Sequence, residues 1–493
     1  MTEPLLTPAE TDELREAFVR ADYTVDACLD AIGPAGQASL GRNHTLAADR
    51  ALAGRDDPLA MLIRLFVLQQ PVPQAAARAA LPAEALLRAG ILTETRDATT
   101  ATLDMRPYSS DDSSPAWIAS DHAATLDTAR GAPTNDHVLG VSPASTTLAE
   151  ITPRRLVGRA LDLGTGCGVQ TLHLARHADQ VVATDLNPRA LRLADLTLRL
   201  SGVDADLREG SLYDPVRDDA FDLIVTNPPF VMAPPTRSGL VYREGTHTGD
   251  GLMREVVVAG AQHLAPNGTL QVLGNWAHLR GEPWDERLAG WIGGTGCDGY
   301  VVQREVLDPY EYVEIWLTDA GLAGTPEYKA RYAEWLAYFD EIGVEAIGMG
   351  WVTVHRAGRE KATVRVEDWP HAVQQPVGDT LLRHLETSTG LTDQAILATR
   401  WRLDPDAIQE TLGQPGAADP SHVVLRQTTG LRRGVEVDTA LGGILGACDG
   451  DLPLAAIIGA VAGILEVDEP ALSAEVLPRV RGLVADLWLT PAD

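Results

Sequence analysis

The spacing of apolar residues changes twice along the chain. Apolar positions recur at helical spacing in the N-terminal stretch LREAFVRADYTVDACLDAIG, which follows a capping box from Thr7 to Glu10. From about residue 135 to 375, short apolar runs alternate with helical patterns, which predicts a mostly parallel sheet covered by helices. Beyond residue 375 the spacing is helical again. We therefore predict an α/β domain between two flanking modules, with boundaries at 1–105, 106–150 (a linker), 151–375 and 376–493.

The two flanking modules have patterns of their own. LPAEALLRAGIL, followed by the alternating TATLDMRPYS, predicts a helix that leads into a wing-like pair of strands. We interpret residues 1–105 as a helical substrate-recognition domain, with a winged-helix-like form as an alternative. Residues 376–493 are interpreted in the same way, as a second helical or winged-helix-like domain.

The longest apolar run, LPLAAIIGAVAGIL, covers 452–465 and is 14 residues long. A membrane-spanning helix needs about 20 such residues, so we expect a buried helix here and no membrane association. The first residues, MTEPLLTPAE, lack the apolar core of a signal peptide. The four cysteines lie far apart, which favours a reducing compartment without disulfides. Together these features predict a cytoplasmic protein.

The charge of the chain narrows the choice of partners. There are 69 acidic and 40 basic residues, and the formal net charge is −29. Proteins that bind nucleic acid usually present a basic stripe to the phosphates, whereas the arginines here are scattered. We therefore expect a protein or peptide substrate rather than a nucleic acid.

The strongest candidate for chemistry is a strand, a glycine-rich turn and a helix in RALDLGTGCGVQTLHLARHA. Gly164, Gly166 and Gly168 allow the backbone to turn tightly and to approach a ligand at the helix N-terminus. The next strand, VVATDLNP, ends in Asp185, whose carboxylate can accept both hydroxyls of a ribose. The order of strand, turn, helix, strand and acid predicts a nucleoside site.

LDLGTGCG resembles motif I of the class I S-adenosylmethionine-dependent methyltransferases, and VVATDLNP is similar to their ribose-binding motif. The resemblance implies a Rossmann-like, seven-stranded sheet. It also implies that Asp162 and the 164–168 loop hold the methionyl end of the cofactor, Asp185 the ribose, and the segment after the next strand the adenine. Ser211 stands where many relatives have Asp. The implied cofactor-binding set is Asp162, Gly164, Thr165, Gly166, Gly168, Asp185, Leu186, Ser211, Leu212 and Asn227.

The stretch FDLIVTNPPF is a buried strand that ends in an amide, two prolines and an aromatic ring. Prolines have no N–H to donate, so the carbonyl groups of Asn227 and Pro228 are left as acceptors for a substrate. Two acceptors can hold the hydrogens of a planar NH₂ group and orient its nitrogen, while Phe230 offers a flat apolar face. We predict that Asn227, Pro228, Pro229 and Phe230 form the catalytic motif.

NPPF resembles the signature of methyltransferases that act on planar NH₂ groups. GDGL (249–252) and HVLGVSPASTTLAEI (137–151) resemble segments of the HemK/PrmC class, which methylates a glutamine amide, and the second of these is their pre-catalytic segment. Phe230 stands where that class has Tyr and is commoner among nucleic-acid enzymes. Three hypotheses follow: a protein or peptide glutamine N-methyltransferase, a nucleic-acid methyltransferase acting on adenine N6 or guanine N2, and a cofactor-binding scaffold.

Two further sets of residues are candidates for binding a substrate or a metal ion. Tyr242 and Arg243, in VYREG, follow the NPPF motif and are candidates for binding the substrate. His173 and His177 have the spacing of metal ligands on a helix, but no third ligand accompanies them. We therefore assign these histidines a structural role and expect no metal site.

Overall fold

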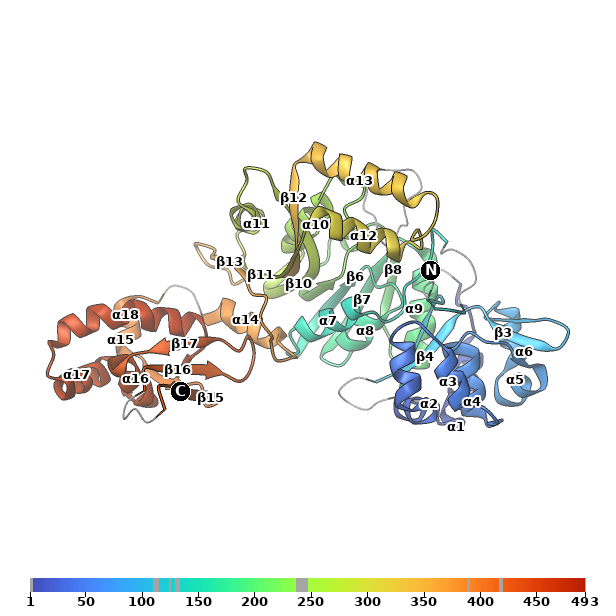
Figure 1. The fold of residues 1–493 in the computed structure, drawn as a ribbon, viewed down its shortest axis with the longest axis horizontal. Helices are drawn as coiled ribbons and strands as arrows, with labels where there is room; N and C mark the ends of the chain where they lie inside the picture. Colours follow the sequence, from blue (N-terminus) through green and yellow to red (C-terminus); the bar gives the residue numbers. More distant parts are fainter. Residues whose placement is uncertain are drawn as a thin grey trace.

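The protein is elongated, with a central sheet between two smaller units (Figure 1). The N-terminal unit, in blue, and the C-terminal unit, in red, lie on opposite sides of the sheet. The structure is a computed structural model. It describes residues 3–109, 115–123, 126–128, 134–235, 247–387, 391–415 and 420–492.

The central sheet has eight strands among the described residues, and its order is β13-β11-β12-β10-β9-β6-β7-β8. The five strands β8, β7, β6, β9 and β10 are neighbours in this order and run parallel. Numbered by their place in the chain they are the third, second, first, fourth and fifth, which is the order of a doubly wound sheet. The strands are β6 (Val157–Leu163), β7 (Ala178–Asp185), β8 (Asp206–Glu209), β9 (Phe221–Thr226), β10 (Leu264–Leu279), β11 (Asp298–Leu307), β12 (Val344–His355) and β13 (Val364–Asp368).

This architecture confirms the predicted α/β class but not the number of strands. We expected seven strands, and β13 is an eighth, paired in parallel with the outer edge of β11 from Gly299 to Gln303. β13 provides hydrogen-bond partners for backbone groups of β11 that would be unpaired if β11 were the edge strand. Strand β12 runs antiparallel to both of its neighbours.

Helices cover both faces of the sheet. On one face, α10 and α11 pack against Leu270, Val272 and Trp276. On the other, α7 and α14 pack against Tyr300, Val302 and Trp351. The helices around the sheet are α7 (Pro143–Ile151), α8 (Val169–Leu174), α9 (Pro188–Leu200), the 3₁₀ turn η2 (Asp214–Val216), α10 (Gly251–Gln262), α11 (Trp284–Gly293), α12 (Pro309–Asp319), α13 (Tyr328–Ile342) and α14 (Gly378–Thr387).

The N-terminal unit shares its core with the central domain. Its buried residues form one cluster with Val169, Leu172 and Leu193 of α8 and α9, and Ser201 accepts the backbone N–H of Trp117. Helix α6 leads into the antiparallel pair β2–β3. The elements are α1 (Pro8–Arg20), α2 (Val25–Leu40), α3 (Leu46–Ala51), α4 (Pro58–Leu62), the π-helix η1 (Ile63–Val67), β1 (Val72–Pro73), α5 (Gln74–Ala80), α6 (Ala83–Arg88), β2 (Leu92–Glu94), β3 (Ala98–Ala101), β4 (Asp104–Tyr108) and β5 (Ala116–Ser120).

The C-terminal unit contains more strand than its helical spacing indicated. Helices accompany two three-stranded sheets, β15-β16-β17 and β18-β14-β19. An ion pair between the buried Arg433 and Glu367 joins this unit to the central domain. The elements are α15 (Asp393–Ala398), β14 (Arg400–Leu403), β15 (Ala407–Leu412), β16 (His422–Gln427), β17 (Gly434–Val437), α16 (Thr439–Gly446), β18 (Asp449–Pro453), α17 (Leu454–Leu465), α18 (Glu469–Ala485) and β19 (Leu489–Pro491).

Helix α17 corrects the expectation of a buried helix at 452–465. Leu454, Ile457 and Ile458 are buried, but Ile464 is 79% exposed. The helix therefore packs through one side only, against α15, α16, α18 and β18. In the described part of the chain, no helix is both long and apolar enough to cross a membrane.

Candidate functional site

The register of three parallel strands brings the predicted site together. Leu163 of β6 pairs with Thr184 of β7 on one side and with Thr226 of β9 on the other. The residues that follow each of these, Asp185, Gly164 and Asn227, therefore form one row at the carboxyl edge of the sheet. Ligands of open α/β sheets bind at this edge.

The glycine turn between β6 and α8 has the backbone that only glycine adopts without strain. Gly164, Gly166 and Gly168 have φ angles of 79°, 56° and 86°. A Cβ atom at Gly164 or Gly166 would meet no atom within 4 Å, whereas at Gly168 it would lie 3.2 Å from the Cα of Ala194. The first two glycines thus leave space beside the loop, and the third lets α8 approach α9.

Asp185 organises this loop from the end of β7. Its Oδ2 accepts the backbone N–H of Gly166 at 2.9 Å, and its Oδ1 accepts that of Asn187 at 2.8 Å. Burial raises the pKa of the Asp185 carboxyl, and these backbone donors oppose the rise. Each oxygen keeps a second lone pair, so the carboxylate can still accept hydroxyl groups of a ligand.

Asp162 is a second buried carboxyl close to the first. It is 1% exposed, and its Oδ2 accepts the hydroxyl of Thr171 at 2.7 Å. The Thr171 hydroxyl also lies 3.0 Å from that of Thr165. Burial raises the pKa of Asp162 to about 6, and the charge of Asp185 adds to the rise. The two carboxyls make this end of the site attractive to a cation.

The segment expected beside an adenine begins after β8. The backbone N–H of Gly210 donates to the carbonyl of Asp185 at 3.0 Å, which holds this segment against β7. Ser211 is exposed, and Leu212 adopts a positive φ of 44°. Leu186, directly after Asp185, is an exposed apolar side chain. Leu186 and Leu212 are therefore apolar side chains available at the strand ends on which a flat ring can rest.

The NPPF motif leaves β9 next to the glycine loop. The hydroxyl of Thr226 donates to the carbonyl of Leu163 at 2.8 Å, which fixes the last residue of β9 against β6. The Oδ1 of Asn227 is buried and has no hydrogen-bond partner among the described residues. The ring of Phe230 lies edge-on to Trp316, with 6.0 Å between their centroids.

Two other segments that sequence patterns singled out support the site. Helix α7 begins with a capping box between Ser142 and Ser145, and the Ser145 carbonyl accepts Nε2 of Gln170 from α8. In GDGL, Asp250 is the N-cap residue of α10, and its carboxylate accepts the N–H of Ala277 and pairs with Arg287. Asp250 therefore anchors α10 to β10 and α11.

The remaining candidates are the two predicted substrate-binding residues and the two histidines. Tyr242 and Arg243 lie outside the described residues. The Nε2 atom of His173 lies 2.7 Å from the hydroxyl oxygen of Tyr108, and this contact joins α8 to β4. Over the ranges that the structure describes, no cluster of three His, Cys, Asp or Glu residues is suited to a metal ion.

Sequence reasoning missed the contribution of α12. Tyr312 is fully buried, and its hydroxyl oxygen accepts the backbone N–H of Met232, two residues beyond Phe230, at 2.9 Å. It also accepts Nδ2 of Asn275, on β10, at 2.8 Å. The aromatic spacing of Tyr312 and Trp316 was a signal of a helix face, but nothing local indicated which face of the sheet it would cover.

The α/β domain has the features of a nucleoside site at the carboxyl edge of its sheet: a glycine turn and an acid at the end of the next strand. The NPPF motif on the adjacent strand adds hydrogen-bond acceptors for a second ligand. Comparison with known families agrees with this class. Residues 139–283 match the family model of the methyltransferase small domain. This match confirms the predicted resemblance to S-adenosylmethionine-dependent methyltransferases. Residues 20–102 and 382–488 each match a domain of unknown function (DUF7059 and DUF7782).

Named relatives fall into two groups. A release factor glutamine methyltransferase of Geobacter sulfurreducens is 33% identical over 156 residues, 29% of this chain and 52% of the relative. A ribosomal RNA small subunit methyltransferase C of Idiomarina loihiensis is 31% identical over 155 residues, 31% of this chain and 41% of the relative. The chain thus spans about half the length, or less, of these curated relatives.

Among solved structures, one similar chain is a 16S rRNA N2 methyltransferase of T. thermophilus in complex with AdoMet and guanosine. It is 19% identical and has a TM-score of 0.27, covering 50% of this chain and 65% of that chain.

Proposed function

We propose that the protein is an S-adenosylmethionine-dependent N-methyltransferase that acts on a planar NH₂ group. The observation that carries this proposal is the buried Oδ1 of Asn227, which has no partner among the described residues and lies one strand from the glycine loop. A buried acceptor without a partner costs about 1–3 kcal/mol. An incoming N–H donor from a substrate would satisfy it.

The residues at the carboxyl edge fit this cofactor. The space beside Gly164 and Gly166 accommodates a ligand close to the backbone. The carboxylate of Asp185 would accept the ribose hydroxyls, and Leu186, Ser211 and Leu212 would border the adenine. Asp162 and Thr165 lie beside the turn, at the end assigned to the methionyl group. Within the described residues, backbone N–H groups and a threonine hydroxyl donate to Asp185 and Asp162, and because these donors are neutral both carboxylates can attract a cationic ligand.

Methyl transfer to a planar NH₂ group requires mainly that the protein position the two reactants. When bound, the cofactor would supply a methyl group on a sulfonium, from which a neutral thioether is the leaving group as the carbon–nitrogen bond forms. The substrate nitrogen then carries a positive charge and loses one proton to water. Asn227 Oδ1 and the Pro228 carbonyl would accept the two N–H groups, and Phe230 would support the planar group. No general base is needed before attack.

We propose a glutamine side-chain amide of a protein or peptide as the substrate. Residues 309–342 comprise α12, which contacts Phe230 through Trp316, then a connecting segment and α13, and they carry seven acidic and two basic side chains. Negative charge beside the NPPF motif repels a phosphate backbone. Glutamine methyltransferases are among the named relatives. We further propose that the N-terminal unit recognises the substrate, since it shares a core with α8 and α9.

A second candidate substrate is the N2 amine of guanine in ribosomal RNA. It is favoured by the relatives named as ribosomal RNA small subunit methyltransferases. The same two acceptors would hold the exocyclic amine, and Phe230 would stack on the base.

Labelling distinguishes these substrates. The full-length chain and methyl-tritiated cofactor are added to an extract of a strain that lacks the gene, and the products are treated with ribonuclease or with protease. Label that survives ribonuclease and yields N5-methylglutamine on digestion supports the proposal. Label in methylated guanine or adenine supports the alternative. Cofactor binding without any transfer contradicts the proposed activity and leaves a cofactor-binding scaffold.

Asn227→Ala tests the catalytic motif. Asn227 also belongs to the cofactor-binding set that the resemblance implies, but the change removes no contact to Asp185 or the glycine loop, so we expect cofactor affinity within about threefold of wild type. Single-turnover transfer should fall by about 10²–10³, the usual cost of one preorganised hydrogen-bonding group. Gln262→Ala, an exposed change of an amide side chain at the end of α10 and outside the motif, is the control. Transfer by Asn227→Ala within about tenfold of wild type would refute this role.

A further inference from the structure

Helix α12 contacts the NPPF segment at two points. The hydroxyl of Tyr312 accepts the N–H of Met232, and the ring of Trp316 lies edge-on to that of Phe230. Tyr312 and Trp316 are one helical turn apart and therefore share a face of α12. Their rings also contact each other, with 6.0 Å between centroids. One helix face thus holds both the backbone after the motif and its aromatic ring.

Tyr312 itself is held rigidly by its surroundings. Its ring contacts those of Trp335 and Phe339, which are buried residues of α13. Val231 and Met232 belong to the same apolar cluster. Loss of the hydroxyl alone would leave this packing in place, so the contribution of the two accepted hydrogen bonds can be separated from that of the ring.

The second donor to Tyr312 links it to β10. Asn275 is fully buried, and its Nδ2 donates to the Tyr312 hydroxyl. Its Oδ1 has no hydrogen-bond partner among the described residues. Gln271, four residues earlier, pairs with Val225 of β9, so Asn275 points to the same face of the sheet as Val225. Tyr312 therefore connects the chain after NPPF to the neighbouring strand.

We propose that Tyr312 is a positioning residue that, with Asn275 and Trp316, fixes the NPPF motif for methyl transfer. This inference rests on the proposed function. Transfer requires the target nitrogen to be aligned with the methyl carbon, and a displacement of about 1 Å can cost a hundredfold in rate. The acceptors of Asn227 and Pro228 precede Met232 by only a few residues. A Met232 backbone that is no longer tied to α12 would let the whole motif shift.

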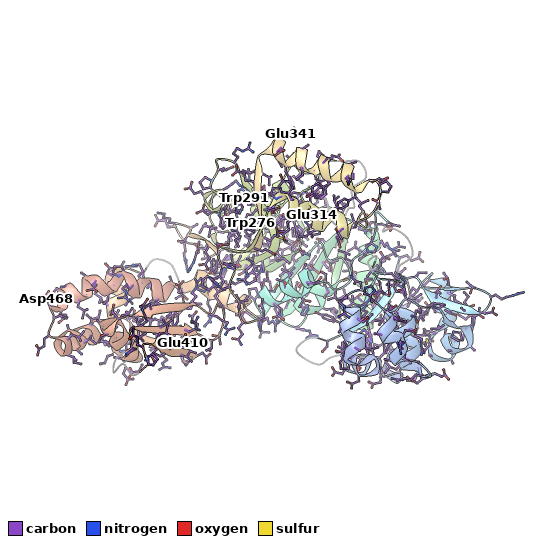
Figure 2. All side chains as sticks on the ribbon, in the orientation of Figure 1. Trp276, Trp291, Glu314, Glu341, Glu410 and Asp468 are labelled. Carbon is purple, nitrogen blue, oxygen red and sulfur yellow. The ribbon has the colours of Figure 1, made fainter. Side chains whose placement is uncertain are left out.

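The helices α12 and α13 pack against each other and lie above the sheet in Figure 1, and Figure 2 labels Glu314 on α12 and Glu341 on α13. The hydroxyl of Tyr332, on α13, donates to the exposed Glu314 at 3.0 Å. Tyr332→Phe therefore removes a hydroxyl from the same pair of helices without removing a contact to the NPPF segment. It is the matched control for Tyr312→Phe.

The experiment compares the two variants in three measurements: calorimetric cofactor affinity, single-turnover methyl transfer to the acceptor found by labelling, and hydrogen exchange at the Met232 amide. For Tyr312→Phe we expect unchanged cofactor affinity, transfer slower by about 10- to 100-fold, and faster exchange at Met232. For Tyr332→Phe we expect all three to stay within about twofold of wild type. A merely structural role would lower cofactor affinity and transfer together.

The outcomes separate this inference from the proposed function. If wild type transfers no methyl group, the proposed function fails and the positioning role fails with it, while exchange at Met232 still tests the hydrogen bond. If wild type is active and Tyr312→Phe transfers within about twofold of it, only the positioning role is refuted. If Tyr312→Phe does not fold, Trp316→Phe replaces it, with the same expected loss of transfer at unchanged cofactor affinity.

Discussion

Asp185 offers a sharp test of the nucleoside site, because both of its oxygens already have backbone partners. In Asp185→Asn one oxygen becomes an NH₂ group. Whichever way the amide turns, this donor faces the N–H of Gly166 or of Asn187. One charge-assisted hydrogen bond is lost in the loop, and the remaining oxygen carries no charge for the ribose.

The size of the effect follows from these contacts. A hydrogen bond to a charged group contributes about 1.5–3 kcal/mol. Loss of the charged contact to the ribose and of order in the glycine loop should together weaken cofactor binding by about 2–4 kcal/mol. This corresponds to a dissociation constant about 30- to 1000-fold higher. Asp185→Ala, which removes both oxygens, should bind at least as weakly.

Titration calorimetry with the cofactor measures the loss directly. Asp179→Asn, at the exposed opposite end of β7, is the matched control and should bind as wild type does. Thermal unfolding without cofactor reports how much of the loss comes from the loop itself. A dissociation constant for Asp185→Asn within about threefold of wild type would refute the ribose assignment, since so small a change is well below the cost of one charged hydrogen bond.

Two further predictions follow from charge. Because the pKa of Asp162 is raised from 3.8 to about 6 in the folded chain, the free protein should lose stability as pH rises through this range. Cofactor affinity should rise about tenfold between pH 5 and 7 as the carboxylate forms, and calorimetry on Asp162→Asn, in which the rise should vanish, checks this. A chain with a net charge of −29 should bind duplex DNA or structured RNA weakly at physiological salt; tight binding with a steep salt dependence in a filter assay would instead favour the RNA substrate.

The row of Asp185, Gly164 and Asn227 was predictable because its information is local. A strand that ends in an acid, a turn that requires positive φ and a strand that ends in prolines are each encoded within about ten residues of sequence. Parallel pairing then brings the ends of adjacent strands to one edge. The sequence therefore determined the α/β class and which segments meet at that edge.

Only the tertiary structure decided what lies over that edge. The contact between Tyr312 and Met232 spans 80 residues, and that between Tyr312 and Asn275 spans 37. The apolar stripe of α12 is compatible with packing on several surfaces, and the choice depends on the shape of the whole domain. The same reason explains β13, whose five residues become a strand because β11 has an open edge. It also explains the sheet β18-β14-β19, because its middle strand pairs with two strands far away in sequence, whereas helical spacing can be recognised within one segment.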